Sequence, residues 1–154
     1  MAKITIKQHD ITDCGAACLA SIAAHYKLQI PIARIRQYAG TDKKGTNVLG
    51  LLEAAQKLGF EAKGVRGDFN SLFKIPKPTI AHIVVKEQLH HYVVIYEVTK
   101  DYIKIMDPGD GRIHKKTHEE FKKEWTGVLV LLLPNDEFSI GNEKVSVYKR
   151  FWFL

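Results

Sequence analysis

The hydrophobic pattern of this 154-residue chain changes its period once, and that change limits the folds the chain can adopt. In the N-terminal part, apolar residues recur three and four positions apart, as they do on one face of a helix. This spacing predicts helices over residues 14–26, 31–39 and 47–58. Gly40 and Gly59 follow the second and third segments, where glycine commonly ends a helix.

The C-terminal part follows the pattern of strands. Segments 79–86, 92–99 and 102–106 are rich in Ile, Val and Tyr, which are typical of strands, and a buried strand is predicted over 127–133. A short helix is expected over 117–124. Helices followed by a mainly antiparallel sheet indicate an α+β domain.

The length fits one domain, which we expect to span residues 1–136. Residues 137–154 are polar, then basic, then aromatic, and we interpret them as a linker, with a loosely packed terminus as the alternative. The longest apolar run, residues 128–133, is far shorter than the ~20 residues of a membrane-spanning helix. The first ten residues lack the apolar core of a signal peptide, so the chain is expected to stay in the cytosol.

The charge pattern gives little support for a nucleic-acid partner. The chain has 23 Lys and Arg against 17 Asp and Glu, a net charge of +6. These basic residues occur in scattered pairs, without a basic recognition helix or a basic strand interleaved with aromatic residues. We therefore interpret them as solvated surface and expect no nucleic-acid partner.

A zinc site is an alternative use of the two cysteines. Cys14, Cys18 and one of His82, His90 or His91 could together supply three ligands. The support is weak, because no second close-spaced pair of ligands is present, and we expect neither a metal nor a cofactor. Cysteine is among the most buried residue types, so Cys18 is predicted to lie in the core.

Cys14 begins the first predicted helix, where unpaired backbone N–H groups favour a thiolate. Asp13, a candidate cap together with Thr12, opposes this effect unless its carboxylate points away. Gln8 could donate to an oxyanion beside the Cys14 N–H. A base and a group that orients it are also needed.

His91, at the head of one predicted strand, and Asp107, at the end of the next, are candidates for these two roles. They can meet only if they share a face of the sheet. A three- or five-residue loop near Lys100 puts them on one face, whereas a two-residue turn at Lys100 and Asp101 puts them on opposite faces. The order Cys, His, Asp along the chain is the one used by papain-like cysteine peptidases.

At these residues the chain resembles the bacteriocin-processing, double-glycine leader peptidases, which form the N-terminal domain of peptidase-containing ABC transporters. The resemblance runs from about residue 4 to residue 138, and its first motif is highly specific. The motifs are QHDITDCGAACL at 8–19, PTIAH at 78–82, HYVV at 91–94, DP at 107–108, WTG at 125–127 and LP at 133–134.

The resemblance implies a papain-like fold with Cys14 as nucleophile, His91 as general base and acid, Asp107 as its orienter and Gln8 as an oxyanion-hole donor. The expected substrate is the leader of a bacteriocin or signalling-peptide precursor, cut after Gly-Gly or Gly-Ala. The expected partners are the transmembrane and ATP-binding domains of the same transporter, at the cytoplasmic face of a bacterial membrane.

Some relatives with a degenerate domain bind cargo without cutting it, so a non-catalytic leader-binding domain is the alternative function. This chain keeps all four active-site residues, which favours the peptidase. Leaders of the family bind as amphipathic helices in an apolar depression. We expect Tyr38, Val48 and Leu52 to contribute to that surface.

Overall fold

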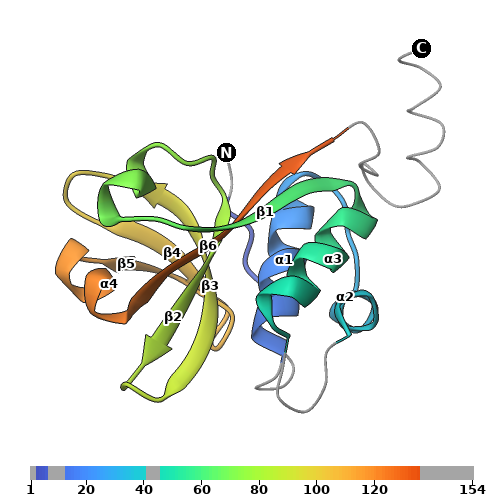
Figure 1. Cartoon of the computed structure of the whole chain (residues 1–154), viewed down its shortest axis with the longest axis horizontal. Helices are drawn as coiled ribbons and strands as arrows, with labels where there is room; N and C mark the ends of the chain where they lie inside the picture. The colour runs from blue at the N-terminus through green and yellow to red at the C-terminus, as the bar shows by residue number, and fades with distance from the viewer. Residues whose placement is uncertain (1–2, 7–12, 41–45, 136–154) are drawn as a thin grey trace.

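The computed structural model of the chain describes residues 3–6, 13–40 and 46–135. Three helices lie on one side of the molecule and a six-stranded sheet on the other (Figure 1). All five strand pairings are antiparallel, in the order β1-β6-β2-β3-β4-β5. The predicted α+β class is therefore confirmed.

The elements are, in chain order, α1 (Cys14–His25), α2 (Ile32–Ala39), α3 (Val48–Leu58), β1 (Phe60–Arg66), the short 3-10 helix η2 (Phe69–Phe73), β2 (Thr79–Val85), β3 (Leu89–Val98), β4 (Ile103–Asp107), β5 (Arg112–Lys116), α4 (His118–Glu124) and β6 (Trp125–Pro134). All four predicted helices and all four predicted strands are present, with ends that differ by a few residues at most.

The helix ends follow from local chemistry. The side chain of Asn47 accepts a hydrogen bond from the Gly50 N–H at 2.8 Å and so caps α3. Gly40 and Gly59 end α2 and α3 in the left-handed conformation that glycine adopts at low cost, with φ of 64° and 100°. Thr117 starts α4 with a capping box.

Two strands, β1 and β5, were not predicted, and both are edge strands of the sheet. Their sequences, FEAKGVR and RIHKK, carry charges, and most of their residues are exposed or half-buried. Charged side chains are common on edge strands, because they discourage pairing with another chain. The two edge strands therefore lack the runs of apolar residues by which the buried central strands were predicted.

The sheet separates two apolar clusters, one on each face. The cluster on the helical side includes Leu19 and Ile22 of α1 together with Val94 of β3. The cluster on the other side includes Ile95 of β3 and Phe121 of α4. Alternation along β3 therefore sends neighbouring residues into different cores.

Helix α3 packs against β1, which runs with β6 across to the helical side of the molecule (Figure 1). No helix in the described part of the chain has the length and apolar character needed to cross a membrane. The linker expected at 137–154 lies outside the described residues, so its interpretation stays a prediction.

Helices α2 and α3 approach each other closely at Gly50. A Cβ added there would lie 2.4 Å from the carbonyl oxygen of Ala39, a backbone atom that cannot move aside alone. We expect Gly50→Ala to destabilise the domain by about 1–3 kcal/mol through overpacking, measured by urea unfolding. At an uncrowded helical site, replacing glycine by alanine would instead stabilise the fold by about 0.5–1 kcal/mol. The sign of the change in unfolding free energy therefore shows whether the site is crowded. Gln56→Ala, at an exposed position of α3, is the matched control and should change stability little.

Candidate active site

Cys14 is the first residue of α1 and is 8% exposed. The backbone N–H groups of a first helical turn have no partner within the helix, so they and the helix dipole favour negative charge at this end. The thiol therefore lies where a thiolate is stabilised by the backbone. Cys18, one turn further, is fully buried, which confirms its predicted place in the core.

Asp13 precedes Cys14, and its carboxylate does not cap α1, so this part of the capping prediction was wrong. Instead, Asp13 Oδ1 lies 3.0 Å from Arg36 Nε of α2. The Asp13 side chain is only 2% exposed, and the guanidinium compensates its charge. The charge that could oppose a Cys14 thiolate is thus paired with a cation. Thr12, the other candidate cap, lies outside the described residues.

His91 and Asp107 meet as predicted. His91 Nε2 lies 2.7 Å from Asp107 Oδ1, which also accepts a hydrogen bond from the Gly109 N–H at 2.8 Å. The backbone of the same turn closes with the Gly111 N–H donating to the Asp107 carbonyl at 2.8 Å. The turn after β4 therefore fixes Asp107 through two hydrogen bonds, one to its side chain and one to its backbone carbonyl.

The way in which these two residues reach the same face differs from the prediction. The pairs Val98↔Ile103 and Glu97↔Lys104 have residue numbers that sum to 201, the odd parity of a two-residue turn at 100–101. That register alone would separate His91 from Asp107. Between Ile95 and Glu97 the register shifts by one residue, and Ile95 pairs with Ile105, a sum of 200. A β-bulge at residue 96 thus restores the shared face.

The charges of the pair support each other. Burial alone would lower the pKa of His91, but hydrogen bonds to Asp107 and Cys14 outweigh it and raise that pKa to about 9. Burial would raise the pKa of Asp107, but the hydrogen bonds from His91 and from the Gly109 N–H outweigh it and lower the pKa. At neutral pH the pair is therefore an imidazolium beside a carboxylate.

His91 links Asp107 to Cys14, since its ring bonds to Asp107 and its pKa is raised by a side-chain interaction with Cys14. The Nε2 atom of His91 faces Asp107, which leaves Nδ1 as the ring nitrogen available to Cys14. A thiol, a base and an orienting carboxylate in this order can perform nucleophilic catalysis on a carbonyl. Gln8, the predicted oxyanion donor, lies outside the described residues.

Tyr92 is a residue at this site that sequence reasoning missed. A Cβ added at Gly15 would lie 3.4 Å from the Tyr92 ring and 3.2 Å from Leu51, so the ring packs closely on the start of α1. Burial, with the nearby Cys14 and Cys18, raises the pKa of Tyr92 to about 12, and the phenol stays neutral. Its position next to His91 in the chain was the only signal in the sequence.

The three residues suggested for substrate binding lie on two neighbouring helices. Val48 and Leu52 are one turn apart on α3, and both face Gly64 of β1, within 3.3 and 3.6 Å of a Cβ built there. Tyr38 is on α2, with Lys57 Nζ of α3 at 5.5 Å from its ring centre. All three side chains are half-buried against the helical core.

The described residues, 3–6, 13–40 and 46–135, bring together no group of three or more His, Cys, Asp or Glu side chains able to hold a metal ion. The three-ligand zinc site built on Cys14 and Cys18 is thus not formed in this part of the chain.

Comparison with known proteins agrees with this geometry. The peptidase C39 family matches residues 3–137. The lactococcin-G-processing and transport ATP-binding protein LagD of Lactococcus lactis subsp. lactis is 45% identical over 154 residues, which cover 99% of this chain and 22% of LagD. The transport/processing ATP-binding protein ComA of Streptococcus pneumoniae R6 is 36% identical over 141 residues, 89% of this chain and 20% of ComA. The chain thus spans about a fifth of the length of these relatives.

Two solved structures are similar to the whole described fold. The peptidase domain of Streptococcus ComA, a bi-functional ABC transporter involved in a quorum-sensing pathway, has a TM-score of 0.82 at 37% identity and covers 87% of this chain and 100% of that one. A double-glycine-motif protease from an AMS/PCAT transporter, solved with the leader peptide, has a TM-score of 0.78 at 35% identity and covers 85% of this chain and 91% of that one. The papain-like peptidase fold expected from the sequence is confirmed.

The interaction between His91 and Asp107 predicts a definite pH dependence. In the folded chain the pKa of His91 is about 9 against the ordinary 6.5, so its protonated form stabilises the fold. That contribution is complete below pH 6.5 and is lost as the pH rises through 9. The Asp107 carboxylate is ionised above its ordinary pKa of 3.8.

Asp107→Asn should therefore lower the free energy of unfolding most between about pH 4 and 6.5, and the difference from the wild type should shrink towards pH 9. NMR titration of the imidazole should show the pKa of His91 falling from about 9 towards 6.5. Asp110→Asn is a matched control, because Asp110 pairs with His114 at the surface. An unchanged His91 titration in Asp107→Asn would contradict the pairing.

Loss of the partner of Asp13 should be costly. Arg36→Met leaves a buried carboxylate without its cation, and we expect the free energy of unfolding to fall by about 1–3 kcal/mol in urea titrations. Alkylation of Cys14 by iodoacetamide at pH 7 should also slow, because the unpaired charge of Asp13 then opposes the thiolate. Gln37→Met, at an exposed position of the same helix, should alter neither quantity.

Proposed function

This chain belongs to the peptidase C39 family and is a cysteine peptidase domain, and we propose that Cys14, His91 and Asp107 are its catalytic residues. The observation that carries the proposal is the 2.7 Å hydrogen bond between the Asp107 carboxylate and His91, whose pKa is also raised by Cys14. The base is thus bound by its orienter and interacts with the proposed nucleophile, the order of groups that acyl transfer requires.

The first half of the reaction uses the charge on His91. Because the pKa of His91 is about 9, the imidazole is protonated at neutral pH. The thiolate of Cys14 is the proposed nucleophile. The sulfur attacks the carbonyl carbon of the scissile peptide bond and forms a tetrahedral intermediate. His91 then gives its proton to the leaving amine, the C–N bond breaks, and an acyl-enzyme remains.

In the second half, neutral His91 removes a proton from water, which attacks the thioester carbonyl. The C–S bond then breaks, and the thiolate and imidazolium are regenerated. Asp107 keeps the ring oriented through both halves and stabilises its positive charge.

The oxyanion of each tetrahedral intermediate needs hydrogen-bond donors. The Cys14 backbone N–H, at the start of α1, is the first donor we propose. The side-chain amide of Gln8 is the second. The buried side chains of Tyr92 and Leu51 lie beside Gly15 and lower the local dielectric at the start of α1, which strengthens such interactions.

The proposed substrate is the leader of a bacteriocin or signalling-peptide precursor, cut after Gly-Gly or Gly-Ala. This assignment is supported by the relatives described as processing proteins and by the related protease solved with a leader peptide. A narrow groove at the scissile bond would exclude a β-branched side chain. The half-buried apolar side chains of Tyr38, Val48 and Leu52 are proposed to contact the leader helix.

The relatives contain much more than this domain, since the chain matches about a fifth of their length. We propose that residues 137–154 lead from the peptidase domain at 1–136 into transmembrane and ATP-binding domains. The peptidase would then act at the cytoplasmic face of the membrane, where removal of the leader is coupled to export of the product.

The central test compares the two cysteines of α1. Cys14→Ala should reduce cleavage of a Gly-Gly leader peptide at least about a thousandfold, while the affinity for the leader stays unchanged. Cys18→Ala is the matched control, since Cys18 lies one turn away in the core and has no proposed role in the reaction. Cleavage is followed by mass spectrometry, and binding by fluorescence anisotropy.

A leader in which the glycine beside the scissile bond is replaced by Val serves as the substrate control and should stay uncut. Full cleavage by the Cys14→Ala variant would rule out the proposed nucleophile. Leader binding without cleavage by the unmodified chain would instead support the alternative, a non-catalytic leader-binding domain.

A further inference from the structure

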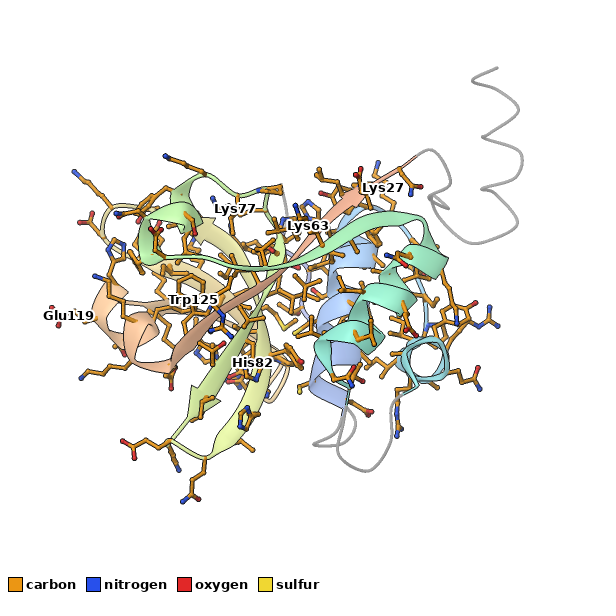
Figure 2. All side chains as sticks on the ribbon, in the orientation of Figure 1. Lys27, Lys63, Lys77, His82, Glu119 and Trp125 are labelled. Carbon is orange, nitrogen blue, oxygen red and sulfur yellow. The ribbon has the colours of Figure 1, made fainter. Side chains whose placement is uncertain are left out.

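Two histidines outside the proposed triad face each other across the β2–β3 hairpin. His90 Nδ1 lies 3.1 Å from His82 Nε2. Residues 82 and 90 point to the same side of the hairpin, because the register pairs His82 with Tyr92 and Val84 with His90. Figure 2 shows His82 on β2, and Trp125 marks the start of the neighbouring strand β6.

The tautomer of His82 is determined by Thr126. The Thr126 hydroxyl donates its one proton to the His82 backbone carbonyl at 3.0 Å, so its oxygen must act as acceptor toward the His82 ring. His82 Nδ1 lies 3.0 Å from that oxygen and therefore carries the ring proton. It follows that Nε2 of His82 directs a lone pair at His90.

The two rings meet through their nitrogens. Their centres are 5.1 Å apart, their planes are inclined by 25°, and the two facing nitrogens lie 3.1 Å apart. Two imidazoles bound to one tetrahedral ion with metal–nitrogen bonds of 2.0–2.1 Å hold their nitrogens about 3.3 Å apart. The observed separation of 3.1 Å is close to this value, and the His90 ring is exposed, so it can turn its Nδ1 lone pair towards a shared ion.

We propose that His82 Nε2 and His90 Nδ1 chelate one divalent transition-metal ion of the imidazole-preferring class, Zn²⁺, Ni²⁺ or Cu²⁺. Water would complete the coordination shell, and the ring proton of His90 would sit on Nε2, which faces solvent. The hydroxyl of Thr126 acts as the outer-shell acceptor that fixes the ligating tautomer of His82, as such groups do at other histidine sites.

A neutral imidazole nitrogen is the form that ligates a metal ion. A metal ion here links β2 to β3 immediately before His91. It should therefore stabilise the hairpin that carries the proposed base, whether or not the peptidase reaction takes place.

The test is a calorimetric titration of the Cys14→Ala chain with ZnCl₂ and with NiCl₂, since removal of the thiol prevents metal capture by Cys14. We expect one equivalent bound and a melting temperature raised by several degrees. His90→Gln should weaken binding at least tenfold and abolish the thermal shift. Thr126→Val should weaken binding about tenfold.

His114→Gln is the matched control, because His114 is also a surface histidine paired with a neighbouring side chain, Asp110. It should leave binding unchanged. His90 is exposed, so its variant is expected to fold, and circular dichroism checks this for His82→Gln as well. The proposal is overturned if neither metal binds, if binding survives His90→Gln, or if Asp107→Asn abolishes binding while His90→Gln does not.

Discussion

The hydrogen bond between His91 and Asp107 joins the start of one strand to the end of the next, and it exists only if both side chains leave the sheet on the same side. The turn between β3 and β4 has the wrong parity for this, and the bulge at residue 96 corrects it. Without that bulge the imidazole would have no carboxylate beside it, and the pKa of His91 would lose its main support. The proposed chemistry at Cys14 thus depends on one unpaired residue in the ladder.

Charge around the thiol is distributed so that each carboxylate has its own cation. Asp13 is paired with Arg36 on α2, and Asp107 is paired with His91 on β3. The sulfur at the start of α1 therefore lies close to an imidazolium and to backbone N–H groups, and the nearest carboxylate in the chain is already neutralised. Packing of α1 on α2 supplies the first pairing, and pairing of β3 with β4 supplies the second.

The sequence predicted those parts of the structure that have a local cause. Helical periodicity, Asn47 and Gly59 define α3, and apolar runs define the central strands. The edge strands were not predicted, because their charged, largely exposed residues lack the apolar pattern by which buried strands are recognised. The bulge and the contact between Arg36 and Asp13 were not predicted, because each depends on how distant segments of the chain pack together. A local sequence pattern carries no information about such packing.

Because of the bulge at residue 96, the length of the β3–β4 turn and the number of residues in the β3 ladder cannot change independently. Only certain combinations of the two keep His91 and Asp107 on one face of the sheet. An insertion of one residue into the turn would be harmless only if the bulge disappeared at the same time. Sequence drift in this hairpin should therefore proceed by paired changes, in which a longer turn goes with a regular ladder and a shorter turn with a kinked one.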